Sequence, residues 1–185
     1  VISSMRCFIA VDLDEVLVNR VREIQEKIKR LDVDVKFVEA QNLHFTLKFL
    51  GEVSNEEIEI VKKDVERAVK GIDAFHVKIG GLGFFGTPGY VRTIWLGITE
   101  GVNNFVNLMK NVNECVKIGK RSDTAHLTIG RVKSGKNREL LMNFINTFRN
   151  VNIGEMYVKS VKLKESILTS RGPVYSDLAL FRLGT

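Results

Sequence analysis

Apolar and polar residues recur with two different periods along the chain, and together they predict a mixture of strands and helices. Residues 43–50 (LHFTLKFL) alternate with a period of two, as a strand with one buried face does. Over residues 15–31 the apolar positions recur every three or four residues, which predicts an amphipathic helix. Ser54, with Glu57 three residues later, predicts a capping box at the start of a helix over residues 55–70.

The same reasoning extends to the end of the chain. Residues 80–90 (GGLGFFGTPGY) are predicted to form a glycine-rich turn region, because glycine favours turns. Residues 156–168 fit either one long strand or two short ones. The other predicted strands or extended segments cover residues 6–13, 35–38, 75–79, 93–98, 125–132 and 175–183, and the other predicted helices cover residues 102–117 and 137–148.

A loose internal repeat organises these elements. The segments His44-Phe45-Thr46-Leu47 and His126-Leu127-Thr128-Ile129 lie 82 residues apart, and each is followed by a short turn, a helix and a strand. No linker separates the two halves. We therefore predict an α+β fold with two pseudo-symmetric lobes in a single domain over residues 1–185. Element order alone leaves other α+β topologies open.

Each copy of the repeat places a histidine and a threonine on one face of a strand. Side chains at i and i+2 of a strand point the same way, about 7 Å apart, so His44 points with Thr46 and His126 with Thr128. An imidazole can give or take a proton near neutral pH. A hydroxyl can donate to an oxygen that gains negative charge. Two such strands across a cleft would suit hydrolysis of a cyclic phosphodiester without a metal.

Two less specific interpretations compete with this one. A strand histidine is commonly a buried or solvated residue without a role, and His76 fits that description because Lys78, not threonine, stands two residues on. A zinc site on His44 and His126 is the second, but the sequence offers no third ligand at a recognisable spacing. We expect no metal and no cofactor.

Charge and composition limit which class of partner and which cellular compartment suit this protein. The 28 basic and 22 acidic residues give a net charge of +6, which suits an anionic partner such as RNA but is also common among proteins that bind none. Cys7 and Cys115 lack metal-ligand spacing and suit a reducing cytoplasm, although a disulfide between them stays open. No apolar stretch reaches the roughly 18 residues that span a membrane. Met5 is a candidate initiator, which would make residues 1–4 upstream sequence.

The two motifs and their surroundings resemble the RNA 2′,3′-cyclic phosphodiesterases, also called the 2′-5′ RNA ligase family, within the two-histidine phosphoesterase superfamily. The pair of H-x-T-x motifs that defines this family stands at residues 44–47 and 126–129, and the resemblance covers nearly the whole chain. It implies two antiparallel sheets that face a central cleft, and hydrolysis of RNA 2′,3′-cyclic phosphate ends to 2′-phosphates. Its other segments are residues 5–12, 92–97, 165–168 and 172–175.

The resemblance also implies a role for each matching residue. His44 would be the general acid toward the departing 3′ oxygen, and His126 the base that activates water, although a symmetric cleft leaves the two roles exchangeable. Thr46 and Thr128 would hold phosphate oxygens. Arg131 matches the family's arginine after the second motif, a candidate phosphate clamp. Strict alternation places Arg131 opposite His126, so this role requires a bulge or twist in the strand.

Further residues are candidates for contact with RNA. Phe8, Phe85 and Tyr90 could stack on a nucleobase, and Phe45 is the poorest candidate because alternation buries it. Lys48, on the predicted His44 face, could attract the RNA backbone.

Some family members also join tRNA halves through a 2′-5′ bond, with a ribose 5′-hydroxyl in place of water. We predict that hydrolysis dominates, in a monomeric cytoplasmic protein that acts on RNA with 2′,3′-cyclic phosphate ends. Two alternatives stay open: a non-catalytic RNA- or nucleotide-binding module, and a phosphodiesterase of small cyclic nucleotides. Turnover of a cyclic phosphate excludes the first, and a comparison of mononucleotide with oligonucleotide substrates separates the second.

Overall fold

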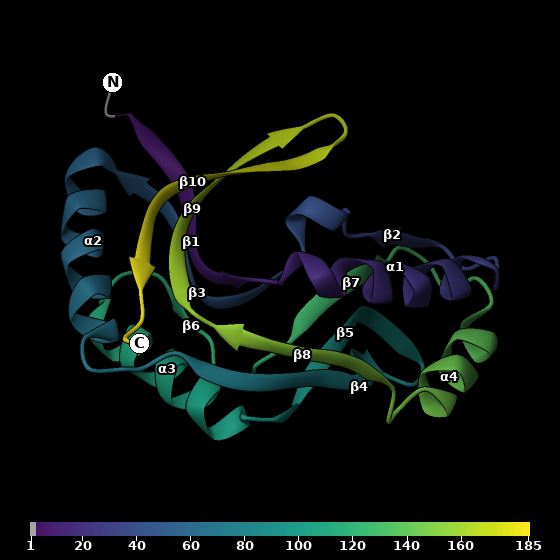
Figure 1. Ribbon diagram of the computed structural model, residues 1–185. Coiled ribbons are helices and arrows are strands. Elements are labelled where there is room, and N and C mark those ends of the chain that lie inside the picture. The colour runs from purple at the N-terminus through teal and green to yellow at the C-terminus, as the bar shows by residue number, and fades with distance from the viewer. Residues whose placement is uncertain (1–2) are drawn as a thin grey trace.

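The computed structural model describes residues 3–185 as one strongly curved antiparallel sheet with four helices (Figure 1). Eight strands form the path β10-β9-β1-β3-β7-β5-β4-β8, and two short strands pair at its middle, β2 with β7 and β6 with β3. The helices are α1 (Glu15–Lys29), α2 (Asn55–Val69), α3 (Val102–Cys115) and α4 (Arg138–Thr147), with a short 3₁₀ helix η1 (Ala40–Asn42). The strands are β1 (Ser4–Asp12), β2 (Val35–Phe37), β3 (His44–Ser54), β4 (Phe75–Thr87), β5 (Tyr90–Glu100), β6 (Lys120–Arg121), β7 (Leu127–Val132), β8 (Asn152–Val158), β9 (Ser160–Thr169) and β10 (Gly172–Arg182).

The two motif strands lie side by side at the centre of this sheet. β3 and β7 are antiparallel and are joined at Phe45, which lies opposite Leu127. Strands β1, β9 and β10 continue the sheet on one side, and β5, β4 and β8 continue it on the other. The predicted α+β class and antiparallel pairing are confirmed. The two sheets that the resemblance implied are the two halves of one continuous sheet.

Two of the helices cross from one half of the sheet to the other. Helix α1 follows β1 but packs against β7 and β8, and α3 follows β5 but packs against β3. The contact of α3 with β3 includes Phe105, whose ring centroid lies 5.2 Å from that of Phe45. The apolar face of each motif strand is therefore covered by a helix that the opposite half supplies, and this leaves the histidine face open.

Local sequence explains where the first two helices begin and end. The Asp14 side chain accepts a hydrogen bond from the backbone N–H of Val16 at 3.1 Å and caps α1. The predicted capping box of α2 is confirmed: Ser54 and Glu57 each accept a hydrogen bond from the other's backbone N–H, at 3.2 and 2.8 Å. Gly71 follows α2 with φ of +78°, a conformation that suits glycine.

The predicted turn region over residues 80–90 is wrong. β4 continues to Thr87 and β5 starts at Tyr90, so the turn is confined to the two residues between them. The glycines serve close packing within the strand instead. A Cβ on Gly80 would lie 2.4 Å from the carbonyl oxygen of Val151, and one on Gly83 would lie 2.5 Å from the Trp95 ring. For residues 156–168 the two-strand alternative is confirmed, as β8 and β9.

Three further predictions meet the structure here. Cys7 and Cys115 are both free thiols, so the disulfide that the sequence left open does not form. No helix in residues 3–185 is long and apolar enough to cross a membrane. Of the four residues before Met5, Val1 and Ile2 lie outside the described part of the chain, whereas β1 already starts at Ser4.

Candidate active site

A cavity of about 700 Å³ lies on the histidine face of β3 and β7. His44, Thr46, His126 and Thr128 all line it, so the structure brings the four residues of the two motifs together. Five basic residues and one acidic residue also line the cavity, which gives it a positive electrostatic character suited to a phosphate-bearing ligand. These charged residues are Arg6, Lys36, Arg131, Lys133, Arg171 and Glu39.

The pairing of β3 with β7 determines how the motif residues oppose one another. Because Phe45 lies opposite Leu127 in an antiparallel pair, the neighbouring residues oppose as well: His44 faces Thr128, and Thr46 faces His126. Directly opposed residues have Cβ atoms about 4.5–5.5 Å apart, and diagonal neighbours are about 7–8 Å apart. The two histidines thus lie on a diagonal of this strand pair, on the face that lines the cavity.

Hydrogen bonds fix the same tautomer in both histidines. The Nδ1 of His44 lies 2.6 Å from the carbonyl oxygen of Asn42, and the Nδ1 of His126 lies 2.9 Å from that of Thr124. A carbonyl oxygen only accepts, so Nδ1 carries the proton in each ring. The Nε2 of His44 lies 3.0 Å from Oγ1 of Thr46. In both copies of the motif, Nε2 is the nitrogen left for chemistry.

Burial lowers the pKa of both histidines. For His44 desolvation outweighs the opposing effects of the Asn42 carbonyl and the Asp12 carboxylate, so its pKa falls below the ordinary 6.5. For His126 desolvation again dominates over the Thr124 carbonyl, and the positive charge of Arg131 lowers the pKa further. Burial therefore favours the neutral form of each ring, in which Nε2 can accept a proton.

A β-bulge in each motif strand changes which side chains face the cavity. In β3, Lys48 pairs with Ile9 and Thr46 with Ala10, so Leu47 is an extra residue in the strand. The bulge turns Phe49 toward the cavity, which it lines with half of its side chain exposed. Sequence alternation gave no sign of this residue, because a bulge depends on pairing with a distant strand.

The second motif strand contains the matching bulge. In β7, Gly130 pairs with Ile94 and Thr128 with Trp95, so Ile129 is the extra residue. Arg131 therefore faces the cavity, as its proposed role requires. Arg131 and Phe49 both stand three residues after a motif threonine, so the internal repeat extends beyond the four-residue motifs.

The prediction that Lys48 contacts the RNA backbone is wrong. The bulge at Leu47 turns Lys48 away from the cavity, and only 4% of its side chain is exposed. Its Nζ donates to the carbonyl oxygens of Val116 and Asn113. Burial lowers the pKa of Lys48, and so do the charges of nearby basic residues.

An aromatic ring packs against each histidine. The centroid of Phe8 lies 4.9 Å from that of His44, and the centroid of Phe85 lies 4.8 Å from that of His126. Both phenylalanines line the cavity, although Phe8 is only 4% exposed. Tyr175, on the β9–β10 hairpin, lies edge-on to His44 at 5.4 Å. Its segment belongs to the resemblance, but no sequence signal gave it a role.

The remaining aromatic and histidine candidates lie elsewhere. Phe45 is 1% exposed and packs in the core, as its position in the alternation predicted. Tyr90 does not line the cavity: it lies at the β4–β5 turn with 71% of its side chain exposed. The predicted stacking of Tyr90 on a nucleobase would therefore have to occur outside this cavity, and it stays a prediction. His76 is also outside, with Nε2 2.9 Å from a carboxylate oxygen of Glu155.

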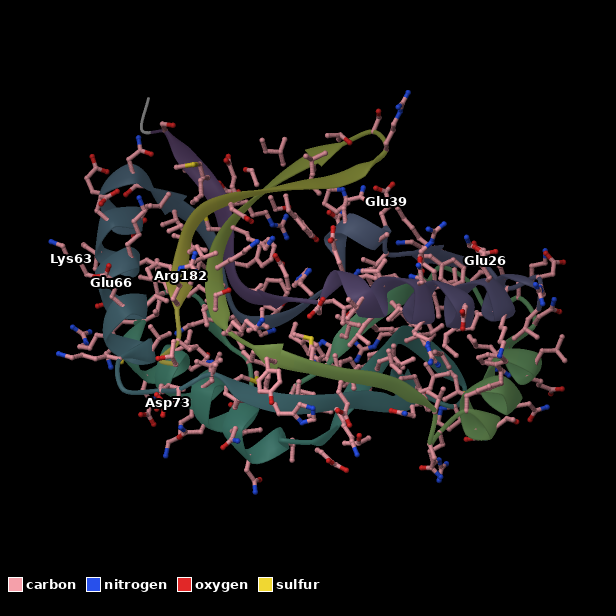
Figure 2. All side chains as sticks on the ribbon, in the orientation of Figure 1. Glu26, Glu39, Lys63, Glu66, Asp73 and Arg182 are labelled. Atoms are coloured by element: carbon pink, nitrogen blue, oxygen red, sulfur yellow. The ribbon has the colours of Figure 1, made fainter. Side chains whose placement is uncertain are left out.

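The β9–β10 hairpin closes one side of the cavity. It projects above β2 and η1 (Figure 1), and Asn42 donates to the carbonyl oxygen of Pro173 at 3.0 Å. Figure 2 shows Glu39, a cavity residue, in the same region, between the hairpin and α1. The cavity is thus bordered by segments more than 120 residues apart in sequence, since η1 ends at Asn42 and the hairpin turn precedes Gly172.

The chain is similar to known proteins over nearly its whole length. The chain is 43% identical over 183 residues to the RNA 2′,3′-cyclic phosphodiesterase of Methanothermobacter thermautotrophicus, covering 97% of this chain and 99% of the relative. It is 38% identical over 181 residues to the protein of the same name from Archaeoglobus fulgidus, covering 96% and 99%.

Solved structures agree as well. A protein of Thermus thermophilus matches with a TM-score of 0.79 and 28% identity over 97% of this chain and 98% of that one. Escherichia coli LigT in its apo form has the same fold, with a TM-score of 0.77 and 22% identity over 98% and 99%. A profile described as LigT like Phosphoesterase matches residues 11–95, which include the first motif. The chain therefore belongs to the LigT-like phosphoesterase family.

Proposed function

We propose that this enzyme hydrolyses RNA 2′,3′-cyclic phosphate ends to 2′-phosphates with its two cavity histidines as an acid–base pair. The observation that carries the proposal is the mirrored pair of imidazoles in one basic cavity. Each has Nδ1 bonded to a backbone carbonyl, so Nε2 is the nitrogen available for proton transfer, and in His44 that nitrogen also lies 3.0 Å from Oγ1 of Thr46. Relatives that match almost the full chain bear the name of this activity, which supports the same substrate class here.

The reaction needs two proton transfers at opposite ends of one phosphorus. A water molecule attacks the phosphorus, and the Nε2 of His126 takes its proton. The bond from phosphorus to the 3′ oxygen breaks, and the protonated Nε2 of His44 gives that oxygen its proton. The product carries a 2′-phosphate and a free 3′-hydroxyl. Each step uses one imidazole, and the diagonal placement of the rings suits an in-line displacement.

The charges around the two rings differ by one carboxylate. The Asp12 carboxylate raises the pKa of His44, while the charges of Lys164 and Arg131 lower it. For His126 the charge of Arg131 lowers the pKa, with no carboxylate among the described residues to oppose it. Asp12 lies opposite His44 in the β1–β3 pair and is held by ion pairs of 2.8 and 3.0 Å to Lys162 and Lys164. We therefore assign the acid to His44, the ring that has a carboxylate beside it to favour its protonated form.

The hydroxyls and the guanidinium would stabilise the charge that develops on the phosphate. Thr46 and Thr128 stand opposite the histidine of the other strand, where a donor can reach a non-bridging oxygen. Arg131, turned inward by the bulge, can pair with the same oxygens in a fork of two hydrogen bonds. These groups and the two imidazoles supply proton transfer and charge stabilisation together, so we propose that the reaction requires no metal ion.

The test is product analysis on an RNA oligonucleotide that ends in a 2′,3′-cyclic phosphate, in the presence of EDTA. We expect a single product with a 2′-phosphate, at a rate unchanged by EDTA or by added divalent cations. A 3′-phosphate product would overturn the assigned leaving group, and loss of activity in EDTA would overturn metal independence. Binding without any product would favour a non-catalytic module.

Ligation and cellular setting are further predictions. Adding an RNA with a free 5′-hydroxyl, such as the matching half of a cleaved tRNA, to the same reaction tests whether a 2′-5′ bond forms by the reverse route. We expect hydrolysis to dominate because water is the more abundant nucleophile. We also retain the prediction of a monomer that acts in the cytoplasm.

A further inference from the structure

Two buried side-chain amides bond to the two bulged residues of the motif strands. Gln25 of α1 is 5% exposed, and Asn113 of α3 is 8% exposed. The Nε2 of Gln25 donates to the carbonyl oxygen of Ile129 at 2.9 Å. The Nδ2 of Asn113 donates to the carbonyl oxygen of Leu47 at 2.9 Å. Each motif threonine is thus followed directly by a bulged residue whose carbonyl is held by a buried amide.

Other hydrogen bonds fix the orientation of each amide. Gln25 also donates to the carbonyl oxygen of Val38 at 2.9 Å. Asn113 donates to Met109 in its own helix at 2.8 Å and accepts from the backbone N–H of Ser122 at 3.2 Å. A bulge takes a residue out of regular pairing, and each amide adds a buried donor at the bulged carbonyl, which at Ile129 also accepts from the backbone N–H of Val38 at 3.0 Å. The amides therefore stabilise the bulged form of each strand against regular pairing.

The two helices that carry these amides are the ones that cross between the halves of the sheet. Gln25 comes from the helix after β1 and holds β7, whereas Asn113 comes from the helix after β5 and holds β3. Each half thus supplies the donor that shapes the motif strand of the other half. Gln25 and Asn113 belong to neither H-x-T-x motif, so sequence spacing did not indicate them.

We propose that Gln25 and Asn113 are positioning residues for the reaction, an inference that rests on the proposed function. Each acts through the bulge it holds, which sets the direction of the motif threonine and of the residue three places later. With regular pairing, alternation would turn Gly130 toward the cavity in place of Arg131. In β3, regular pairing would turn Lys48 toward the cavity in place of Phe49. The two amides disfavour this regular pairing in both strands.

The first test compares amide variants with helix controls. Gln25→Met keeps the side-chain length but removes both donors, and Asn113→Asp keeps the acceptor for Ser122 but removes donation to Leu47. Val21→Ala on α1 and Leu108→Ala on α3 are matched controls, because both residues are fully buried and neither bonds a bulge. We expect kcat on a nucleoside 2′,3′-cyclic phosphate to fall about 10–100-fold in the amide variants.

In the helix controls we expect a change in kcat of less than about threefold, even where the unfolding temperature falls as far or further. All rates are measured at a temperature where circular dichroism shows every variant to be folded. Equal losses of kcat in the amide variants and the controls would show that the amides only stabilise the fold, and the proposal would be wrong.

The second test uses the crossed arrangement of the amides. Gln25→Met is combined with Thr128→Val, on the strand it holds, and separately with Thr46→Val, on the other strand. We expect the losses in kcat/KM to be non-additive when Gln25→Met is combined with Thr128→Val. When it is combined with Thr46→Val, we expect them to be additive. For Asn113→Asp the expected pattern is reversed.

Additive losses in all four combinations would overturn the proposal. If Asn113→Asp does not fold, the two Gln25→Met combinations still test the proposal, because Gln25 acts on β7 independently of Asn113. The same assay measures turnover by the wild type, and the His44→Ala variant serves as the inactive control. Absence of turnover in the wild type would count against the proposed function, whereas normal turnover with additive losses would count against the positioning role alone.

Discussion

Replacing either cavity histidine by alanine is expected to remove nearly all hydrolysis of a 2′,3′-cyclic phosphate. General acid–base help is worth about 10²–10⁴-fold per group, so His44→Ala and His126→Ala should each lower kcat by up to about 10⁴-fold. The two losses should not multiply in the double variant, because a reaction that lacks one proton transfer gains little from the other. Single-turnover rates measure both effects directly.

The control for these variants is His76→Ala. His76 is bonded to Glu155 outside the cavity and takes no part in the proposed reaction, so the variant should keep wild-type kcat and KM. The acid–base assignment would be wrong if His44→Ala or His126→Ala retained rates within about tenfold of wild type while remaining folded.

Removal of the motif hydroxyls is expected to have the next largest effect. Thr46→Val and Thr128→Val keep the β-branched shape but remove the donor that would reach the phosphate oxygens. Loss of one such donor costs about 10–10³-fold in kcat. Because the hydroxyls are proposed to act on charge that builds in the transition state, KM should change much less than kcat.

Serine at the same positions provides the matched control. Thr46→Ser and Thr128→Ser retain the hydroxyl, so we expect them to keep most of the wild-type rate. The Nε2 of His44 lies 3.0 Å from Oγ1 of Thr46, and this bond is present before substrate binds. Full activity in both valine variants would show that phosphate binding depends on other groups, with Arg131 as the first alternative.

The local chemistry of the site could be predicted from sequence because it depends on short-range spacing. His44 with Thr46, and His126 with Thr128, share a strand face by alternation, and the structure places all four in one cavity. The capping box at Ser54 is likewise a local pattern, and the helix begins there. Such features need no knowledge of the partner strand.

Features that depend on pairing between distant strands could not be predicted. The bulge at Leu47 arises from the register of β3 against β1, and it reverses the expected positions of Lys48 and Phe49. The glycines in β4 look like turn signals but serve close contacts, as Gly83 does with the Trp95 ring. Tertiary packing selects these arrangements among several that the local sequence permits.

Site residues that lie far from both motifs in sequence were not predicted either, because their contacts depend on tertiary packing. Tyr175 reaches His44 only because the β9–β10 hairpin folds over the cavity, far from either motif in sequence. Gln25 and Asn113 lie on amphipathic helices, where a polar residue at a buried position carries no indication of the carbonyl it meets. A sequence-level signal for them would be a polar residue within the apolar stripe of a helix, since buried amides need partners.

The pH dependence of kcat/KM tests the central claim most directly, because two imidazoles that exchange protons with one substrate must leave two limbs in the profile. Burial lowers the pKa of both His44 and His126, so we expect a bell whose ascending and descending limbs both lie below pH 6.5. His126→Ala should lose the ascending limb, which reports the base, and His44→Ala should lose the descending limb, which reports the acid. A flat profile between about pH 5 and pH 8 in the wild type, or an unchanged bell in either variant, would contradict it.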